Sequence, residues 1–186
     1  MALDDVLLEA EEKMIKTDGV VQHEFSGIRT GKASPVLVEN IVVDVYGSQM
    51  RIRELAGIST PEPRVLAIQP WDASTVHPIE KAILKSSLGV TPTVQGKIIR
   101  LVLPELSQER RQEMVKLVRK LAEDGRVAVR HVRRDALEAA KKESKTGGVT
   151  EDQLEVAEKE IQKLTDQYIA KIDLQLAGKE KEIMTV

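Results

Sequence analysis

Hydrophobic residues recur at helical spacing in three long stretches of the chain. The second stretch covers residues 107–145 and the third runs from Thr150 almost to the C-terminus. The first covers residues 3–28, with apolar positions at Leu3, Leu7, Ala10, Met14, Val21, Phe25 and Ile28. The stripe of the third contains Leu154, Ala157, Ile161, Leu164, Tyr168, Ile172, Leu176 and Ile183. No amphipathic helix can bury its stripe alone, so the pattern predicts three helices packed as a bundle.

The predicted helix ends carry capping signals. Ser107 precedes the second helix as an N-cap, and the Gly147-Gly148 pair follows its last residues as a stop signal. Thr150 and Gln153 have the spacing of a capping box, which predicts where the third helix begins.

Between the first two helices the hydrophobic period changes to that of β-strands. Strands are predicted over residues 40–46, 50–53, 64–69 and 97–103, with a short helix over 72–86 whose inward positions are Ile79, Ala82 and Ile83. Gly and Pro lie close together in residues 30–35, and two prolines lie in residues 60–63, so both segments are expected to break the chain. This predicts an α+β fold in which residues 1–30 and 105–186 form the bundle and residues 31–104 form an inserted β/α/β domain.

The two crossings between these parts are short and contain Gly or Pro. They are candidates for a hinge, with Thr30 and Gly31 on one crossing and Pro104 and Glu105 on the other. The alternative is one rigid fused domain.

The second helix carries a row of arginines. With about 100° of turn per residue and Ala128 as reference, an apolar seam lies near the reference direction, at Met114, Val118, Leu121, Gly125, Val132 and Ala139. Roughly 140° to 200° away lie Arg119, Arg126, Arg130 and Arg133. A guanidinium group suits bidentate contact with phosphate, so a polyanion is one expected partner of this row. A solvated surface that is rich in arginine is the other interpretation.

Charge along the chain favours the first interpretation. The net charge is −2, but residues 107–145 carry 12 basic and 7 acidic groups, net +5, while residues 1–30 and 146–186 each have net −4. A protein that coats nucleic acid would be basic throughout, whereas this one is built to engage a polyanion through one face. Aromatic residues make up only 2% of the chain, which argues against base-stacking platforms.

Signals for membranes, metals and catalysis are missing from the sequence. No apolar run approaches the roughly 18 residues needed to span a membrane, and the N-terminus lacks the basic start of a secretion signal. Cysteine is absent, which suits a reducing cytosol. His23, His77 and His131 are scattered, and residues 27–33 depart from a phosphate-binding loop in glycine spacing and in the residue after Lys32. We therefore expect neither an enzyme nor a bound metal or cofactor.

Five segments, taken together and in order, resemble the bacterial ribosome recycling factor family over the whole chain. They are Phe25-Ser-Gly-Ile-Arg-Thr-Gly-Lys-Ala-Ser-Pro35, Glu80-Lys-Ala-Ile83 with Leu88-Gly-Val90, Glu109-Arg-Arg111, Arg126-Val-Ala-Val-Arg-His-Val-Arg-Arg-Asp135 and Lys163-Leu-Thr-Asp166. The chain departs from the family at His131, where Asn is frequent, and at Lys32, where Arg is frequent; the second change keeps the charge.

The resemblance implies an L-shaped monomer with a three-helix bundle and a small β/α/β lobe, acting in the cytoplasm without a cofactor. Such a factor binds the large ribosomal subunit across the A and P sites, and elongation factor G with its GTP then drives the subunits apart. Arg130 and Arg133 would be the main anchors on ribosomal RNA, supported by Arg126, Arg119 and Arg134, with Arg29 and Lys32 at the elbow. Arg134 could instead pair with Asp135 or Glu138. A coiled-coil adaptor that uses the same face to bind a protein remains the competing hypothesis.

Overall fold

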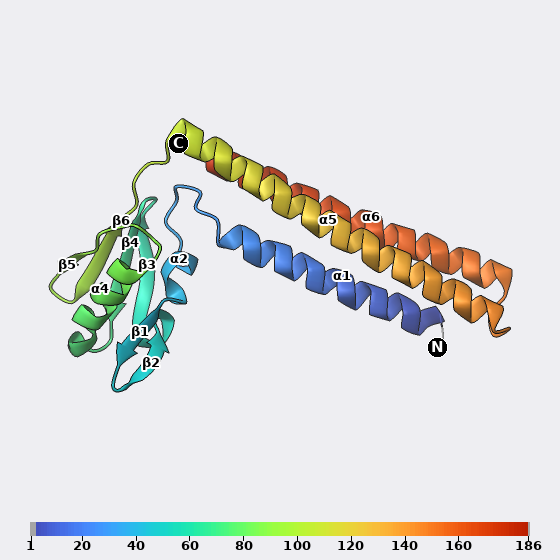
Figure 1. Cartoon of the computed structure of the whole chain (residues 1–186), viewed down its shortest axis with the longest axis horizontal. Helices are drawn as coiled ribbons and strands as arrows, with labels where there is room; N and C mark the ends of the chain where they lie inside the picture. Colours follow the sequence, from blue (N-terminus) through green and yellow to red (C-terminus); the bar gives the residue numbers. More distant parts are fainter. Residues whose placement is uncertain (1–2, 186) are drawn as a thin grey trace. The chain divides into compact units, whose positions relative to one another are not determined.

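The structure, a computed structural model, describes residues 3–185 and divides into two compact units. The bundle unit comprises the described residues up to Ile28 together with Gln112–Thr185, and the small unit comprises Arg29–Arg111 (Figure 1). Each unit has its own hydrophobic core.

The bundle unit is built from three long helices, α1 (Leu3–Ser26), α5 (Gln108–Lys145) and α6 (Glu151–Met184). A tight turn joins α5 to α6, so these two helices are antiparallel, and α1 begins at the end where that turn lies (Figure 1). The predicted caps are confirmed. Ser107 Oγ accepts from Arg110 N–H at 3.2 Å, and the Thr150 and Gln153 side chains each accept from the other's backbone N–H, at 3.3 and 3.0 Å.

The bundle core confirms the stripes predicted for α1 and α6, because every apolar position named in them is buried or partly buried. The larger cluster contains Met14, Val21, Phe25, Val118, Ala122, Val129, Tyr168, Ile172 and Ile183. A smaller cluster, toward the α5–α6 turn, contains Val6, Ala10, Ala136, Ala140 and Ile161. The sequence pattern did not single out Asp18, which is also buried and accepts hydrogen bonds from Gln22 and from Gln175 of α6.

The buried face of α5 differs from the predicted seam. Of the seven seam positions only Val118 and Gly125 are buried, and the other five are partly buried. The remaining fully buried apolar residues are Ala122, Val129, Ala136 and Ala140, which place the centre of the buried face about 90° from Ala128 and toward the arginines. The reason is that α5 contacts two neighbours, α1 and α6, and buries a wider face than a single seam. The arginine row therefore borders the core instead of lying opposite it.

Gly125 lies where α5 comes close to both α1 and α6. A Cβ atom at this position would lie 2.6 Å from Cγ2 of Val21 on α1 and 3.4 Å from Cδ1 of Ile172 on α6. A side chain there would displace Val21, so this glycine lets α5 pack closely on both neighbours.

The small unit has two antiparallel sheets and short helices. A hairpin of β1 (Val42–Val45) and β2 (Ser48–Arg51) stands beside a four-stranded sheet of order β3-β4-β6-β5, formed by β3 (Ala56–Glu62), β4 (Val65–Pro70), β5 (Thr93–Gln95) and β6 (Ile98–Val102). The helical elements are α2 (Val36–Glu39), α3 (Ile52–Leu55), a 3-10 turn η1 (Ala73–Thr75) and α4 (Val76–Lys85) (Figure 1). Ile79 and Ile83 of α4 are buried in one core cluster with Ile99 and Leu101 of β6, and Ala82 packs against it partly buried, so the predicted inward positions are confirmed.

The prediction of a break at residues 60–63 was wrong for residues 60–62, which end strand β3. Pro61 is tolerated there because β3 is an edge strand and its pairing with β4 shifts register between Ser59 and Glu62. The predicted strand over 50–53 also ends early, since helix α3 begins at Ile52.

Candidate nucleic-acid interface

The arginine row of α5 lies along the boundary with α6, and three of its members contact that helix. Nε of Arg119 lies 2.5 Å from Oε1 of Glu180, and Nη2 of Arg126 lies 2.7 Å from Oδ1 of Asp173. Nη1 of Arg133 donates to the amide oxygen of Gln162 at 3.4 Å. These arginines are spaced seven residues apart on α5. Because α5 and α6 are antiparallel, the residue numbers of their partners on α6 decrease as those of the arginines increase. Part of the row therefore holds two helices together.

Glu123 is shared by two arginines of the row. Its two carboxylate oxygens accept from Nη1 of Arg126 at 2.9 Å and from Nη1 of Arg130 at 3.1 Å. These hydrogen bonds, the one from Arg126 first, lower the pKa of Glu123. For Arg126 partial burial lowers the pKa, but the hydrogen bonds to Asp173 and Glu123 outweigh it, so the pKa of this guanidinium is raised. Arg126 is thus the most strongly paired member of the row, with 20% of its side chain exposed.

Arg133 and Arg134 form no ion pair with any carboxylate in residues 3–185. Arg133 has only the neutral Gln162 as partner, and Nη2 of Arg134 lies 2.6 Å from Nδ1 of His131 instead of meeting Asp135 or Glu138. The five arginines of this helix that were singled out from the sequence therefore share three carboxylates. The surface keeps a net positive charge that is concentrated around Arg130, Arg133 and Arg134.

Two further cations extend this surface toward the start of α5. Lys116 and Lys120 are exposed, and neither is ion-paired within the described part of the chain. On the helical wheel they lie on the outer side of the arginine row. Both lysines continue the row at helical spacing, so the same charge pattern in the sequence indicates them.

Arg29 and Lys32 lie in the small unit, on the segment that follows α1. Nη1 of Arg29 donates to the backbone oxygen of Leu88 at 3.0 Å, so part of this guanidinium fixes the loop after α4. Lys32 is exposed. The structure therefore gives Arg29 a structural contact and leaves the ammonium group of Lys32 open to solvent.

The four hinge candidates lie in two segments, and each segment is hydrogen-bonded to the turn between β3 and β4. Ala33 N–H donates to the backbone oxygen of Pro63 at 2.7 Å, and Leu103 N–H donates to that of Arg64 at 2.8 Å. Nη1 of Arg64 also lies 2.8 Å from Oε1 of Glu105.

Beyond these anchors, Gly31 adopts φ 86, in the left-handed region that glycine favours, and the side chain of Thr30 is buried. In both segments the residue that is hydrogen-bonded to the β3–β4 turn, Ala33 in one and Leu103 in the other, therefore belongs to the small unit.

Within residues 3–185 no group of three or more potential metal-ligating side chains occurs, and no helix is long and apolar enough to cross a membrane.

Comparisons with known proteins agree with the fold. The sequence profile of the family described as ribosome recycling factor matches residues 21–184. The ribosome-recycling factor of Akkermansia muciniphila is 52% identical, with both chains covered in full, and that of Carboxydothermus hydrogenoformans is 50% identical over 99% of this chain and 100% of its own.

Two solved structures are similar over the whole chain. A solution structure of the ribosome recycling factor is 45% identical with a TM-score of 0.81, and covers 100% of this chain and 99% of its own. The second, 40% identical with a TM-score of 0.71 and covering both chains in full, represents models for the T. thermophilus ribosome recycling factor and the E. coli elongation factor G bound to the E. coli post-termination complex. The chain therefore belongs to the ribosome recycling factor family, whose members are translation factors rather than enzymes.

Proposed function

We propose that this protein recycles ribosomes after termination. It binds the large subunit across the A and P sites, and with elongation factor G and its GTP it separates the subunits and releases the ribosome from messenger RNA. The work takes place in the cytoplasm, which the lack of cysteine favours. Nucleotide hydrolysis belongs to the elongation factor, and the protein itself acts as a monomeric lever.

The observation that carries this proposal is the uneven pairing of the arginine row. Arg119 and Arg126 are neutralised by acids of α6, but Arg133 meets only a neutral amide, and Arg130 shares one carboxylate with Arg126. Guanidinium groups without carboxylate partners keep their full charge for phosphate oxygens. We therefore assign Arg133, which has no carboxylate partner among the described residues, as a main contact with ribosomal RNA. Arg130 is the second main contact, because its one carboxylate, Glu123, is shared with Arg126, and Arg134 is a support.

The remaining predicted contacts take subordinate roles. Arg119 and Arg126 position the row by tying α5 to α6, and they reach RNA only in part. Lys32 contributes its charge near the crossing, and Arg29 combines RNA contact with its hold on Leu88.

We further propose that residues 1–30 with 105–186 and residues 31–104 move as two bodies. Motion would be taken up at Thr30 and Gly31 on one crossing and at Pro104 and Glu105 on the other. The positive φ of Gly31 supports this placement.

The test is a subunit-splitting assay with purified 70S ribosomes, elongation factor G and GTP, in which light scattering monitors the separation of the subunits. Wild-type protein should lower the scattering, and the double variant Arg130→Ala/Arg133→Ala should do so at least tenfold more slowly at equal concentration. Lys13→Ala/Lys159→Ala is the matched control, because it removes two cations that are exposed and paired within their own helices. If the wild type leaves the scattering unchanged, the proposed function is wrong.

A further inference from the structure

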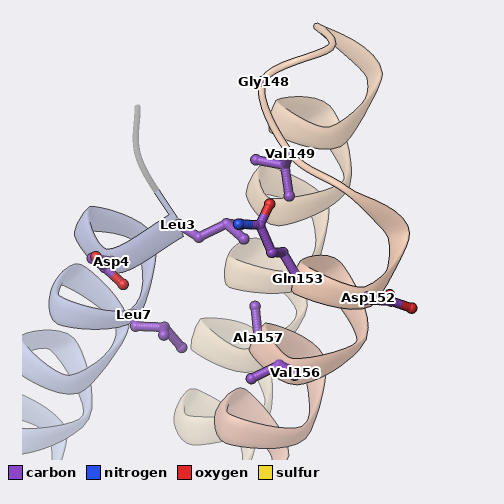
Figure 2. Close-up of a pocket in the computed structure, with 9 residues that line it drawn as sticks. All are labelled: Leu3, Asp4, Leu7, Gly148, Val149, Asp152, Gln153, Val156 and Ala157. Atoms are coloured by element: carbon purple, nitrogen blue, oxygen red, sulfur yellow. The ribbon is translucent and has the colours of Figure 1, made fainter.

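An apolar pocket of about 490 Å³ opens at the end of the bundle where α1 begins and α5 turns into α6. Leu3 and Leu7 of α1 point toward Gln153 and Val156 of α6, and Val149 closes the end nearest the turn (Figure 2). Leu3 and Leu7 pack on the smaller core cluster, but Val156 leaves 61% of its surface exposed. On one side of the pocket Leu3 and Leu7 are held by the core, and on the other side Val156 is accessible to solvent.

Acidic groups lie at the margins of this pocket, and Figure 2 shows the side chain of Asp152 on the outer side of α6, pointing away from Leu7. Asp4 and Asp152 belong to its lining and are exposed, and neither has an ion-pair partner among the described residues (Figure 2). The first turns of α1 and α6 add Asp5 and Glu151. The cations at the end of α5, Lys142 and Lys145, do not line the pocket.

This combination selects the chemistry of the occupant. A nucleic-acid backbone would be repelled by the carboxylates and would leave the aliphatic wall in contact with water. A protein segment with an apolar side chain beside lysine or arginine matches both features, since its apolar group fills the pocket while its cations face Asp4 and Asp152. This end of the bundle is acidic and the arginine row is basic, so the two surfaces are expected to bind different partners.

We propose that this end of the bundle is a docking site for a basic protein segment of the large ribosomal subunit, which inserts an apolar side chain between Leu7 and Val156. The inference rests on the proposed function, because it takes the large subunit as the source of that segment. It adds a protein contact to the RNA contacts of α5.

The experiment uses the absence of cysteine, which makes a single introduced thiol unique. Val156→Cys is labelled with a benzophenone maleimide, bound to purified large subunits and irradiated, and the product is identified by mass spectrometry. Leu174→Cys is the control, since Leu174 is 75% exposed on the same helix and lies outside the pocket. We expect a covalent adduct with a basic ribosomal protein from position 156, and no such adduct from position 174.

A charge-reversed form, Asp4→Lys/Asp152→Lys in the Val156→Cys background, should reduce the yield of that adduct roughly tenfold. An adduct with ribosomal RNA or with a second copy of this chain would overturn the proposal, and so would an unchanged yield after charge reversal or no adduct from bound protein. Co-sedimentation without irradiation comes first. If unmodified protein fails to bind large subunits, the proposed function itself fails, and this outcome is distinct from a protein that binds without the adduct.

Discussion

Nε of Arg126 donates to Oδ1 of Asp173 at 2.8 Å, so the arginine row is a structural tie between α5 and α6 as well as a candidate RNA surface. Arg133, one heptad further along α5, has no carboxylate partner among the described residues. Two arginines of the same row therefore serve different purposes, and substitution can separate them.

Arg126→Ala should destabilise the bundle more than Arg133→Ala does. Loss of Arg126 removes contacts to Asp173 and Glu123 from a mostly buried side chain, which we place at about 1 kcal/mol, the upper end for partly exposed ion pairs. Loss of Arg133 should change the free energy of unfolding by less than about 0.5 kcal/mol. Urea unfolding midpoints followed by far-UV circular dichroism measure both, and equal losses would contradict the division of roles.

Gly125→Ala should destabilise the bundle although alanine is the better helix former. The new Cβ would clash with Val21, and overpacking of this kind costs about 1–3 kcal/mol, more than the roughly 1 kcal/mol gained in helix propensity. Gly19→Ala is the matched control, because a Cβ there meets nothing within 4 Å. It should raise stability by up to about 1 kcal/mol. If urea unfolding shows that both variants are equally stable, the claim that the helices pack too closely at Gly125 for a Cβ atom is wrong.

Asp18→Ala should loosen the contact between α1 and α6. Asp18 is 8% exposed and accepts from Nε2 of Gln175 at 2.8 Å, so its removal leaves a partly buried amide without its acceptor, at a cost of about 1 kcal/mol or more. The double variant Asp18→Ala/Gln175→Leu removes both polar groups and should recover part of this loss. The stabilities of the single and double variants form the test, and additive losses would argue against coupling between the two side chains.

Gly31→Val should slow subunit splitting while leaving affinity for the large subunit nearly unchanged. A β-branched residue is disfavoured at φ 86, so the crossing would be forced into another backbone conformation. Gly147→Val is the control, since Gly147 has a similar φ of 83 but lies in the turn between α5 and α6, away from both crossings. Splitting by light scattering and binding by co-sedimentation are measured side by side. Equal splitting rates for the two variants would contradict the assignment of Gly31 to the hinge.

The helices of the bundle could be predicted from sequence because their signals are local. Ser107 and Thr150 cap helices within three residues of themselves, and the stripe from Leu154 to Ile183 repeats at helical spacing. The orientation of α5 could not be predicted in the same way. The pattern near Ala128 reports apolar residues, whereas the buried face is decided by two packing partners and includes alanines that a hydrophobic stripe underweights.

Long-range pairing accounts for the rest. Arg126 and Asp173 are 47 residues apart, and only the register of α5 against α6 shows that they meet. Strand β3 was missed because Pro61 is a breaker in most local contexts but not at the edge of a sheet. Candidate RNA contacts were visible as a charge pattern, yet which of them retain free charge depended on the acids of another helix.

The central claim is that free guanidinium groups on α5 anchor the protein to ribosomal RNA, and co-sedimentation with purified large subunits tests it most directly. Wild type and Arg133→Ala are compared at several salt concentrations between about 50 and 200 mM. We expect at least a tenfold loss of affinity for Arg133→Ala with unchanged far-UV helicity, and a shallower dependence on salt by about one unit of the log–log slope. Equal affinities for the two proteins, or wild-type binding that is insensitive to salt, would contradict the account.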